Sequence, residues 1–171
     1  MTVLDGAIVT LRPIELSDRD TLIAIRSTPE VRDRWGELDS AADEVDEDFK
    51  DTETVHLAVV YEGRVVGMIQ YYEEEEPKYR QANIDIYLDP SVHGRGIGTD
   101  AVRTVARFLL KERGHHRLVI DPAADNTPAI KCYAKVGFRP VGVMRQYERG
   151  LDGTWHDGLL MDLLASEFQE G

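Results

Sequence analysis

Three glycines at alternate positions are the clearest chemical feature of this chain. They lie in the run Val92-His93-Gly94-Arg95-Gly96-Ile97-Gly98-Thr99, between a strand-like segment and a long segment with helical spacing. Glycines leave backbone N–H groups uncovered, and the first N–H groups of a helix carry partial positive charge. Such a loop can hold a phosphate or a pyrophosphate. The sequence therefore predicts a phosphorylated ligand at this loop.

The charge distribution sets this loop apart from the rest of the chain. The 171 residues carry a net charge of −12, yet residues 89–139 contain nine Lys and Arg against five Asp and Glu. A basic segment around a glycine loop suits an anionic cofactor, whereas an acidic remainder attracts a cation. Nucleic acid is not an expected partner, because an acidic surface repels phosphate.

Composition limits the class of protein further. A length of 171 residues indicates a single domain over residues 1–171, and 42% apolar residues are enough to bury a core. We expect no membrane span and no signal peptide, because no apolar run approaches roughly 20 residues. The single cysteine, Cys132, fits a reducing cytoplasm and is interpreted as a core residue on a helix. We also expect no metal, since no Cys and His residues have zinc-site spacing.

Hydrophobic periodicity and turn signals predict a mixed order of strands and helices. Hairpin turns are expected at Glu62-Gly63-Arg64 and around Asp152-Gly153. The expected strands cover residues 7–12, 56–61, 65–72, 82–88, 117–120, 141–149 and 155–164. The expected helices cover residues 17–26, 29–35, 98–111 and 127–136. Residues 37–53 contain nine acidic residues and one lysine, which indicates a solvated helix or loop.

Two other kinds of phosphate-binding loop are alternatives for these glycines. A nucleoside-triphosphate P-loop is excluded, because no Lys-Ser or Lys-Thr follows them. A dinucleotide fingerprint is a closer rival, since Gly96 to Ala101 fits G-x-G-x-x-G/A and Asp121 ends a strand 20 residues later. Against it, the preceding strand ends at Leu88 and leaves a loop before the glycines. Only 50 residues follow Asp121, too few for the rest of such a sheet.

Two motifs, about 30 residues apart, resemble those of the GCN5-related N-acetyltransferases. The run from His93 to Gly98 is similar to the family's acyl-CoA loop, Q/R-x-x-G-x-G/A, with His93 where Gln or Arg is usual. The run from Asn126 to Phe138 is similar to the segment N-x-x-A-x-x-x-Y-x-x-x-G-F. Segments such as Arg34-Trp35-Gly36 and Ile84-Asp85 also resemble aminoglycoside 6′-N-acetyltransferases.

The resemblance implies an α+β fold with acetyl-CoA as the cofactor. We expect a mixed, mostly antiparallel twisted sheet of about seven strands, flanked by about four helices. A bulge near residues 86–88 is expected to splay the fourth strand from the fifth, and the pantetheine arm would lie in that gap. The residues expected to bind the cofactor are Tyr87, Leu88, His93, Gly94, Arg95, Gly96, Ile97, Gly98, Thr99, Asn126, Ala129 and Tyr133.

Acetyl transfer to an amine needs a neutral amine, a polarised thioester carbonyl and a proton for the departing thiolate. By the resemblance, Tyr133 is the general acid, with a ring that merely packs in the core as the alternative. Asp85 lies mid-strand on the face opposite Ile84 and Ile86, where its carboxylate could take the proton from the attacking ammonium. The alternative for Asp85 is an ordinary solvent-facing residue of an amphipathic strand.

Several carboxylates near Asp85 would suit a polycationic acceptor. The residues expected to bind the acceptor are Trp35, Glu73, Glu74, Glu75, Asp85 and Asp121. Asp121 ends the strand over 117–120, where it either faces the cleft or forms a turn. Alternation would place two of the glutamates on one face, although a run of like charges is usually a solvated strand end. Trp35 either walls the acceptor pocket or packs in the core.

These residues predict an acetyl-CoA-dependent N-acetyltransferase acting on an aminoglycoside or a similar polycationic amine. The alternatives are an acetyltransferase for protein N-termini or small metabolic amines, and a non-catalytic acyl-CoA-binding module. The expected partner is a small cationic amine, and the expected state is a monomer or a homodimer.

Overall fold

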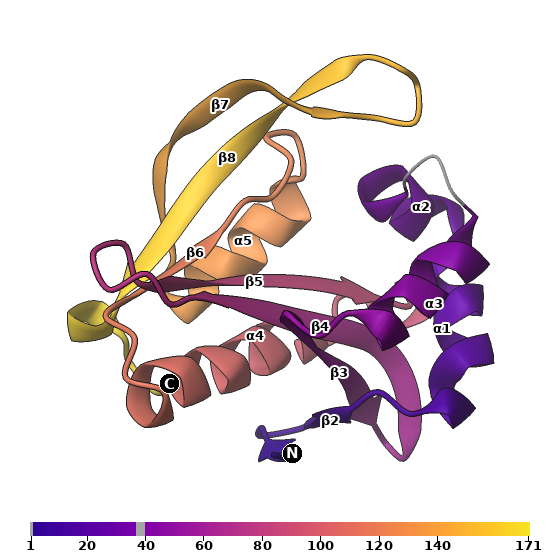
Figure 1. Ribbon diagram of the computed structural model, residues 1–171, viewed down its shortest axis with the longest axis horizontal. Helices are drawn as coiled ribbons and strands as arrows, with labels where there is room; N and C mark the ends of the chain where they lie inside the picture. The colour runs from indigo at the N-terminus through magenta and orange to yellow at the C-terminus, as the bar shows by residue number, and fades with distance from the viewer. Residues whose placement is uncertain (1, 37–39) are drawn as a thin grey trace.

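Eight strands form one sheet in a computed structural model that describes residues 2–36 and 40–171 (Figure 1). The sheet order is β1-β2-β3-β4-β5-β6-β8-β7. The strands are β1 Leu4–Asp5, β2 Thr10–Pro13, β3 Thr54–Tyr61, β4 Arg64–Glu74, β5 Gln81–Leu88, β6 Arg117–Ile120, β7 Arg139–Arg149 and β8 Trp155–Leu164. All neighbours pair antiparallel except β5 and β6. The expected mixed, mostly antiparallel sheet is confirmed, and the additional strand is β1, too short to show a period.

Five α-helices accompany the sheet in the described residues. They are α1 Arg19–Arg26, α2 Pro29–Trp35, α3 Ala41–Lys50, α4 Ile97–Arg107 and α5 Thr127–Val136. The acidic segment contributes α3, while its residues 37–39 lie outside the described residues. After Arg107 the chain of α4 continues through one wider π-helical turn, Phe108–Glu112. The expected helix over 98–111 is therefore confirmed, with a change of winding near its end.

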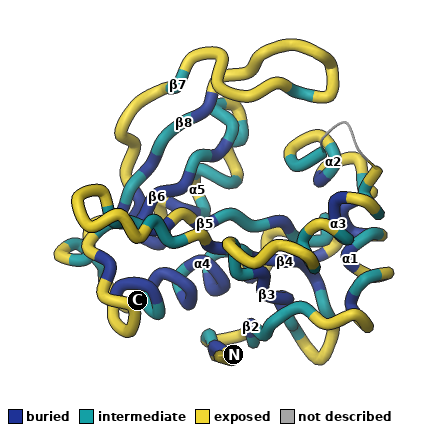
Figure 2. The backbone as a smooth tube through the Cα atoms, in the orientation of Figure 1, coloured by how far each residue is buried: buried dark blue, intermediate teal, exposed yellow. Residues whose placement is uncertain are grey.

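The helices cover both faces of the sheet. Met68 and Ile69 are neighbours on β4, and alternation along the strand points them to opposite faces. Met68 packs in a cluster with residues of α1, α2 and α3, including Leu22, Val31 and Val45. Ile69 belongs to the larger core, which contains apolar residues of α4 and α5. Figure 2 shows buried residues along α4 and the central strands.

The sheet opens between β5 and β6. β5 pairs with β4 along its whole length without a register shift, but it meets β6 only at Ala82 and Asn83. From Ile84 to Leu88 one edge of β5 has no paired strand. The expected splay is confirmed, whereas the expected bulge near residues 86–88 is wrong. The gap forms because the two strands diverge after Asn83 and Val119: Ile120 still belongs to β6, but it pairs with Met161 of β8 and no longer with β5.

Asp100, in the first turn of α4, holds the N-terminal turn against the helix. Its carboxylate accepts hydrogen bonds from the backbone N–H groups of Ala7 (2.9 Å), Ile8 (2.8 Å) and Val9 (3.0 Å). The backbone of Gly6 lies so close to the Asp100 side chain that a Cβ on Gly6 would be 2.5 Å from an Asp100 oxygen. The start of α4, and with it the glycine loop, is therefore fixed to the turn between β1 and β2.

Asp100→Asn is expected to lower the free energy of unfolding by about 2 kcal/mol, because an amide has one oxygen for three backbone donors, of which that of Val9 is buried. Urea denaturation would measure this loss. Asp20→Asn is the matched control, since the Asp20 side chain is 98% exposed and should change stability by less than about 0.5 kcal/mol. Equal urea midpoints for Asp100→Asn and the native chain would contradict this anchoring role.

Candidate active site

A cavity of about 980 Å³ opens where β5 separates from β6. Residues of β5, the glycine loop, the start of α5, α2 and β7 line it. It contains most of the residues predicted from sequence: Trp35, Asp85, Tyr87, Leu88, His93, Gly94, Gly96, Ile97, Gly98, Thr99, Asp121, Asn126, Ala129 and Tyr133. Predicted cofactor and acceptor residues therefore meet in one space.

The glycine loop is shaped to receive a phosphate. Gly94 and Gly96 both have φ near +79°, and a Cβ at either position would have no atom within 4 Å. Gly96 precedes α4, so the N–H groups of the first helical turn have no partner within the helix. A positive helix end with open space before it suits a pyrophosphate. The residues present therefore fit the phosphorylated cofactor that the sequence predicts.

The remaining loop residues differ in their position. The imidazole Nε2 of His93 lies 3.2 Å from the carbonyl oxygen of Leu88, so it ties the loop to the end of β5. Arg95 is exposed and does not line the cavity. Its predicted contact with the pyrophosphate thus stays a prediction that only the bound cofactor can test.

The first turn of α5 closes the cofactor side of the cavity. The Asn126 side chain accepts the N–H of Ala129 at 3.4 Å and caps the helix. Cys132 Sγ lies 3.3 Å from Thr99 Oγ1, and a Cβ on Gly98 would lie only 3.4 Å from that sulfur. Cys132 is on a helix as predicted, but it is only half-buried and lines the cavity.

Asp85 and Tyr133 face the cavity with contrasting proton affinities. Burial, and then the charge of Asp121, raise the pKa of the Asp85 carboxyl to about 7. Burial, and then the charge of Asp85, raise the pKa of the Tyr133 hydroxyl well above 10. Near neutral pH, Asp85 can therefore accept a proton while Tyr133 keeps its own. A base and an acid of this kind are what acetyl transfer to an amine needs.

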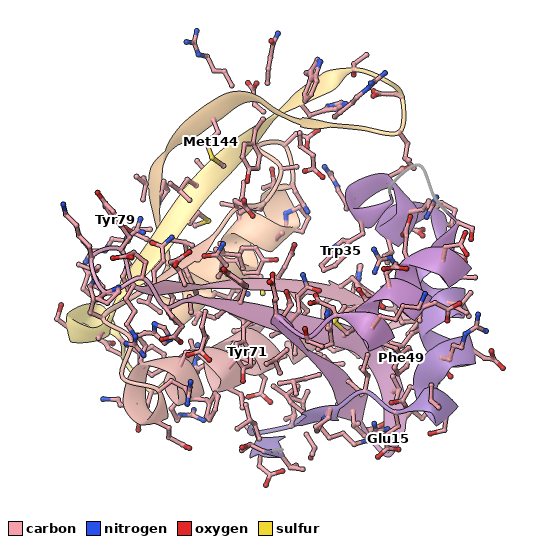
Figure 3. All side chains as sticks on the ribbon, in the orientation of Figure 1. Glu15, Trp35, Phe49, Tyr71, Tyr79 and Met144 are labelled. Atoms are coloured by element: carbon pink, nitrogen blue, oxygen red, sulfur yellow. The ribbon has the colours of Figure 1, made fainter. Side chains whose placement is uncertain are left out.

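Trp35 forms part of the cavity wall, as predicted. Its indole N–H donates to the carbonyl oxygen of Ile86 at 3.2 Å. The Trp35 side chain thereby satisfies a backbone acceptor in the part of β5 that has no paired strand on one edge. The ring meets Tyr87 edge-to-face at 5.0 Å between centroids. Figure 3 shows Trp35 pointing from α2 toward the region between α2 and the sheet. Tyr87 is buried against α1 to α3, and burial raises the pKa of its hydroxyl.

Several cavity residues were not predicted from the sequence. Tyr147 and Glu148 reach the cavity from β7, and Glu30 and Arg34 reach it from α2. The Tyr147 hydroxyl donates to Asp121 Oδ2 at 2.8 Å. The sequence gives no signal for these residues, because their position depends on how α2 and the distant β7–β8 hairpin pack around the cavity.

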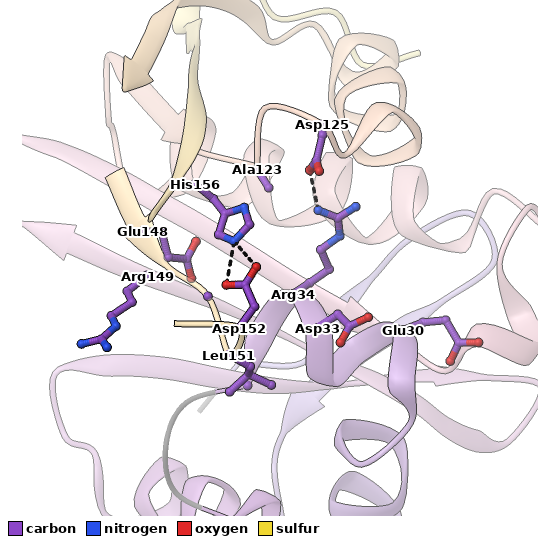
Figure 4. A pocket seen from close by; sticks show the side chains of 12 residues that line it. Glu30, Asp33, Arg34, Ala123, Asp125, Glu148, Arg149, Leu151, Asp152 and His156 are labelled. Atoms are coloured by element: carbon purple, nitrogen blue, oxygen red, sulfur yellow. Dashed lines mark hydrogen bonds and ion pairs between the residues drawn. The ribbon is translucent and has the colours of Figure 1, made fainter. Parts of the chain in front are cut away.

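A second cavity of about 570 Å³ lies beside the first, under the tip of the β7–β8 hairpin. The two cavities share Glu30, Arg34, Ala123 and Glu148. Figure 4 shows the ion pair between Arg34 and Asp125, with 2.6 Å between nitrogen and oxygen, at its edge. The hairpin and α2 therefore form one continuous rim around both cavities.

The predicted acceptor residues Glu73, Glu74 and Glu75 are not in the cavity, and this prediction is wrong. β4 runs antiparallel to β5, so Glu74 pairs with Gln81 while the cleft end of β5, Leu88, pairs with Gly67. The glutamates consequently lie at the opposite end of the sheet.

Glu73 has a structural partner there instead. Its Oε2 lies 2.6 Å from His115 Nε2 and 3.2 Å from Arg113 Nε. Burial opposes the charged carboxylate, but these hydrogen bonds outweigh it and lower the pKa of Glu73. Within the described residues, Glu73, Glu75 and His115 bring possible metal-ligand atoms within 4.8 Å of one another. Arg113 already neutralises the shared carboxylate, which favours an ion-pair network.

In the described residues, β5 and β6 are the one parallel pair of neighbouring strands, and a cavity opens where they separate. A glycine loop beside this cavity leads into α4. Together these features define an acyl-CoA-dependent acyltransferase fold. A family model described as an acetyltransferase (GNAT) domain matches residues 9–139. The chain belongs to this family. Its acetyl donor is acetyl-CoA, and the dinucleotide alternative is wrong because the sheet is mainly antiparallel. Among residues 2–36 and 40–171, no helix has the length and apolar character to cross a membrane.

Several known proteins similar to this chain are named as acetyltransferases, and one of those below is named for its acceptor. The probable N-acetyltransferase YjcK of Bacillus subtilis is 24% identical, over 98% of this chain and 100% of its own. Spermidine N(1)-acetyltransferase of Escherichia coli is 22% identical, over 94% of this chain and 88% of its own. The structure of Mycobacterium smegmatis RimJ in complex with CoA-disulfide matches with a TM-score of 0.82 at 22% identity, over 97% of this chain and 87% of that one. They share the fold and leave the acceptor open.

CoA at 100 times its Kd is expected to slow alkylation of Cys132 by about a hundredfold, because only about one site in a hundred then stays open. Since the chain has one cysteine, the loss of free thiol with N-ethylmaleimide reports this position directly. Adenosine alone, which lacks the pantetheine arm, is the control ligand. An equal alkylation rate with and without CoA would contradict the placement of the cofactor between α4 and α5.

Proposed function

We propose that this protein transfers the acetyl group of acetyl-CoA to a primary amine of a polycationic acceptor, such as an aminoglycoside. The observation that carries this proposal is the charge division within one cavity. Its acceptor side presents the carboxylates of Glu30, Asp85, Asp121 and Glu148, and Arg34, the one arginine among the described residues of that side, is paired with Asp125. Lys131 and Lys135 line the cavity with the glycine loop on the cofactor side. An anionic donor and a cationic acceptor would each meet the opposite charge.

The donor supplies an acetyl thioester, and the chain supplies its position. The N–H groups at the start of α4 would bind the pyrophosphate, and the unpaired edge of β5 would provide backbone N–H groups along the pantetheine arm. One such N–H can donate to the carbonyl oxygen as negative charge develops on it. The splay between β5 and β6 is thus the part of the fold that makes this cavity a site for acyl transfer.

Asp85 and Tyr133 then move the protons. The acceptor enters as an ammonium, and the ionised Asp85 carboxylate takes one proton so that the neutral amine can attack the carbonyl carbon. The carbon–sulfur bond would then break as Tyr133 gives its proton to the departing sulfur, and the proton that the new amide nitrogen must lose would return to the Tyr133 phenolate. Asp121 and Glu148 stabilise the remaining positive charge of the acceptor. No acyl-enzyme is required.

The relatives support an amine acceptor and leave its class to experiment. One of them is named for spermidine, a polycationic amine, which supports an acceptor of this charge class. Thiol release from acetyl-CoA should be measured with kanamycin, tobramycin and spermidine, and with a peptide bearing a free N-terminal amine. We expect turnover with at least one polycation and a lower kcat/KM with the peptide. Turnover of the peptide alone would favour the protein N-terminal alternative and contradict the proposed acceptor.

A further inference from the structure

β7 breaks the register of the C-terminal hairpin at the edge of the active site. Met144 pairs with Gly158 and Glu148 pairs with His156, so three residues of β7 stand opposite Asp157 alone. Gln146, the middle residue, has φ of 49°, in the left-handed region. Its N–H donates to Asp157 Oδ1 at 2.8 Å. The bulge is therefore held by a specific hydrogen bond from the facing strand.

The bulge changes which side chains face the cavity. Successive residues of a regular strand point to opposite faces, so neighbours do not share one side. Tyr147 and Glu148 are neighbours after the bulge, and both line the cavity. The two extra residues of β7 interrupt the regular alternation there, because a bulge turns the local side-chain direction.

The backbone of β8 and of the loop after β6 fixes the position of the Tyr147 ring. A Cβ on Gly158 would lie 3.0 Å from a ring carbon of Tyr147, so the glycine leaves room for the ring. The backbone of β8 is bonded to the loop after β6, with Leu159 N–H donating to the Pro122 carbonyl at 2.8 Å. Tyr147 thus reaches Asp121 across a fixed distance, and its hydroxyl donates to Oδ2 at 2.8 Å.

We propose that Tyr147 is a positioning residue for the acceptor: by binding Oδ2 of Asp121 it holds that carboxylate beside Asp85, with Oδ1 directed to an ammonium group of the substrate. This inference rests on the proposed function, and it identifies the β7 bulge as a determinant of acceptor binding. The hydrogen bond to Asp121 raises the pKa of the Tyr147 hydroxyl to about 12. The hydroxyl consequently stays a donor throughout the pH range in which the enzyme would be assayed.

Tyr147→Phe is expected to raise the KM for the polycationic amine about tenfold, because a hydrogen bond to a charged group is lost. The kcat should stay within about twofold and the Kd for CoA should not change, since neither the base nor the cofactor seat is touched. Tyr79→Phe is the matched control, because Tyr79 is 68% exposed and far from the cavity. A thermal melt of each variant separates a binding effect from a loss of folding.

A double mutant tests whether Tyr147 acts through Asp121. If it does, Tyr147→Phe combined with Asp121→Asn should raise the amine KM no further than Asp121→Asn alone. An unchanged KM in Tyr147→Phe, or two effects that multiply, would overturn the proposal.

The bond itself can be tested without an acceptor. In Asp121→Asn, NMR titration should show the pKa of the Tyr147 hydroxyl falling from about 12 toward 10. A pKa that stays at about 12 in Asp121→Asn would show that this bond does not exist. If the native protein acetylated no amine while the pKa fell as expected, the proposed function would fail and the bond would stand.

Two substitutions of Gln146 test the role of the bulge. Gln146→Gly should keep the native KM, since glycine adopts a positive φ readily, whereas Gln146→Val should raise the KM as Tyr147→Phe does. Equal KM values for these two variants, with similar melting temperatures, would contradict the role of the bulge.

Discussion

Asp85→Asn is expected to lower kcat for acetyl transfer about a thousandfold, within the range found when a general base is removed. The amide has nearly the same size, but it cannot take a proton from the ammonium. The Kd for CoA should be unchanged, because Asp85 lies on the acceptor side of the cavity. Steady-state thiol release with a polycationic amine measures the first quantity, and calorimetric titration with CoA measures the second.

The pH dependence gives this prediction a second, independent readout. With the pKa of Asp85 at about 7, kcat/KM of the native enzyme should fall as the pH decreases below about 7 and the carboxylate is protonated. The Asp85→Asn variant should lack that limb of the profile. A native limb retained in Asp85→Asn would assign the base to another residue.

Folding stability provides the control for Asp85. A carboxyl whose pKa is raised by folding adds stability below its unfolded pKa and loses it as the pH rises through about 7. Asp85→Asn removes this loss, so its melting temperature relative to the native chain should increase between pH 5 and pH 8. A thermal melt series at several pH values would show whether low activity has any origin in unfolding.

Tyr133→Phe should lower kcat about a hundredfold, because the departing sulfur then lacks its proton donor. The ring is 6% exposed and packs edge-to-face with Phe138, so phenylalanine should preserve the packing. The Kd for CoA and the melting temperature should stay close to those of the native chain. The Tyr79→Phe variant is again the control, and a native kcat in Tyr133→Phe would leave this tyrosine a purely structural role.

The sequence predicted those parts of the site that one continuous segment determines. The glycine loop and the start of α5 each carry their function in local spacing, and both line the cavity. Asp85 was predicted from alternation along a single strand. For such residues, the neighbours in sequence largely determine the neighbours in space.

The errors concern residues whose position depends on long-range pairing. Glu73 to Glu75 follow a strand correctly predicted, yet the antiparallel register of β4 against β5 carries them away from the cleft. The expected bulge in β5 was wrong for a similar reason, since the splay depends on where the pairing of β5 with β6 ends. Periodicity predicts a strand, but it does not predict which end of its partner it will meet.

Tyr147 and Glu148 show a third limit of the sequence. Both belong to a correctly predicted hairpin, whose regular alternation would place them on opposite faces. The bulge at Gln146 interrupts this alternation, and a glutamine gives no signal of a left-handed backbone position. The acceptor side is consequently the part of the cavity that the sequence predicted least well.

Mass spectrometry of a polycationic amine incubated at pH 8 with acetyl-CoA and the protein tests the central claim most directly. We predict that tobramycin or spermidine gains one acetyl group on an amine, and that the gain is abolished or greatly slowed with Asp85→Asn. CoA should be released in equal amount. An unmodified amine, with CoA released at the same rate whether or not the amine is present, would contradict acetyl transfer to a cationic acceptor.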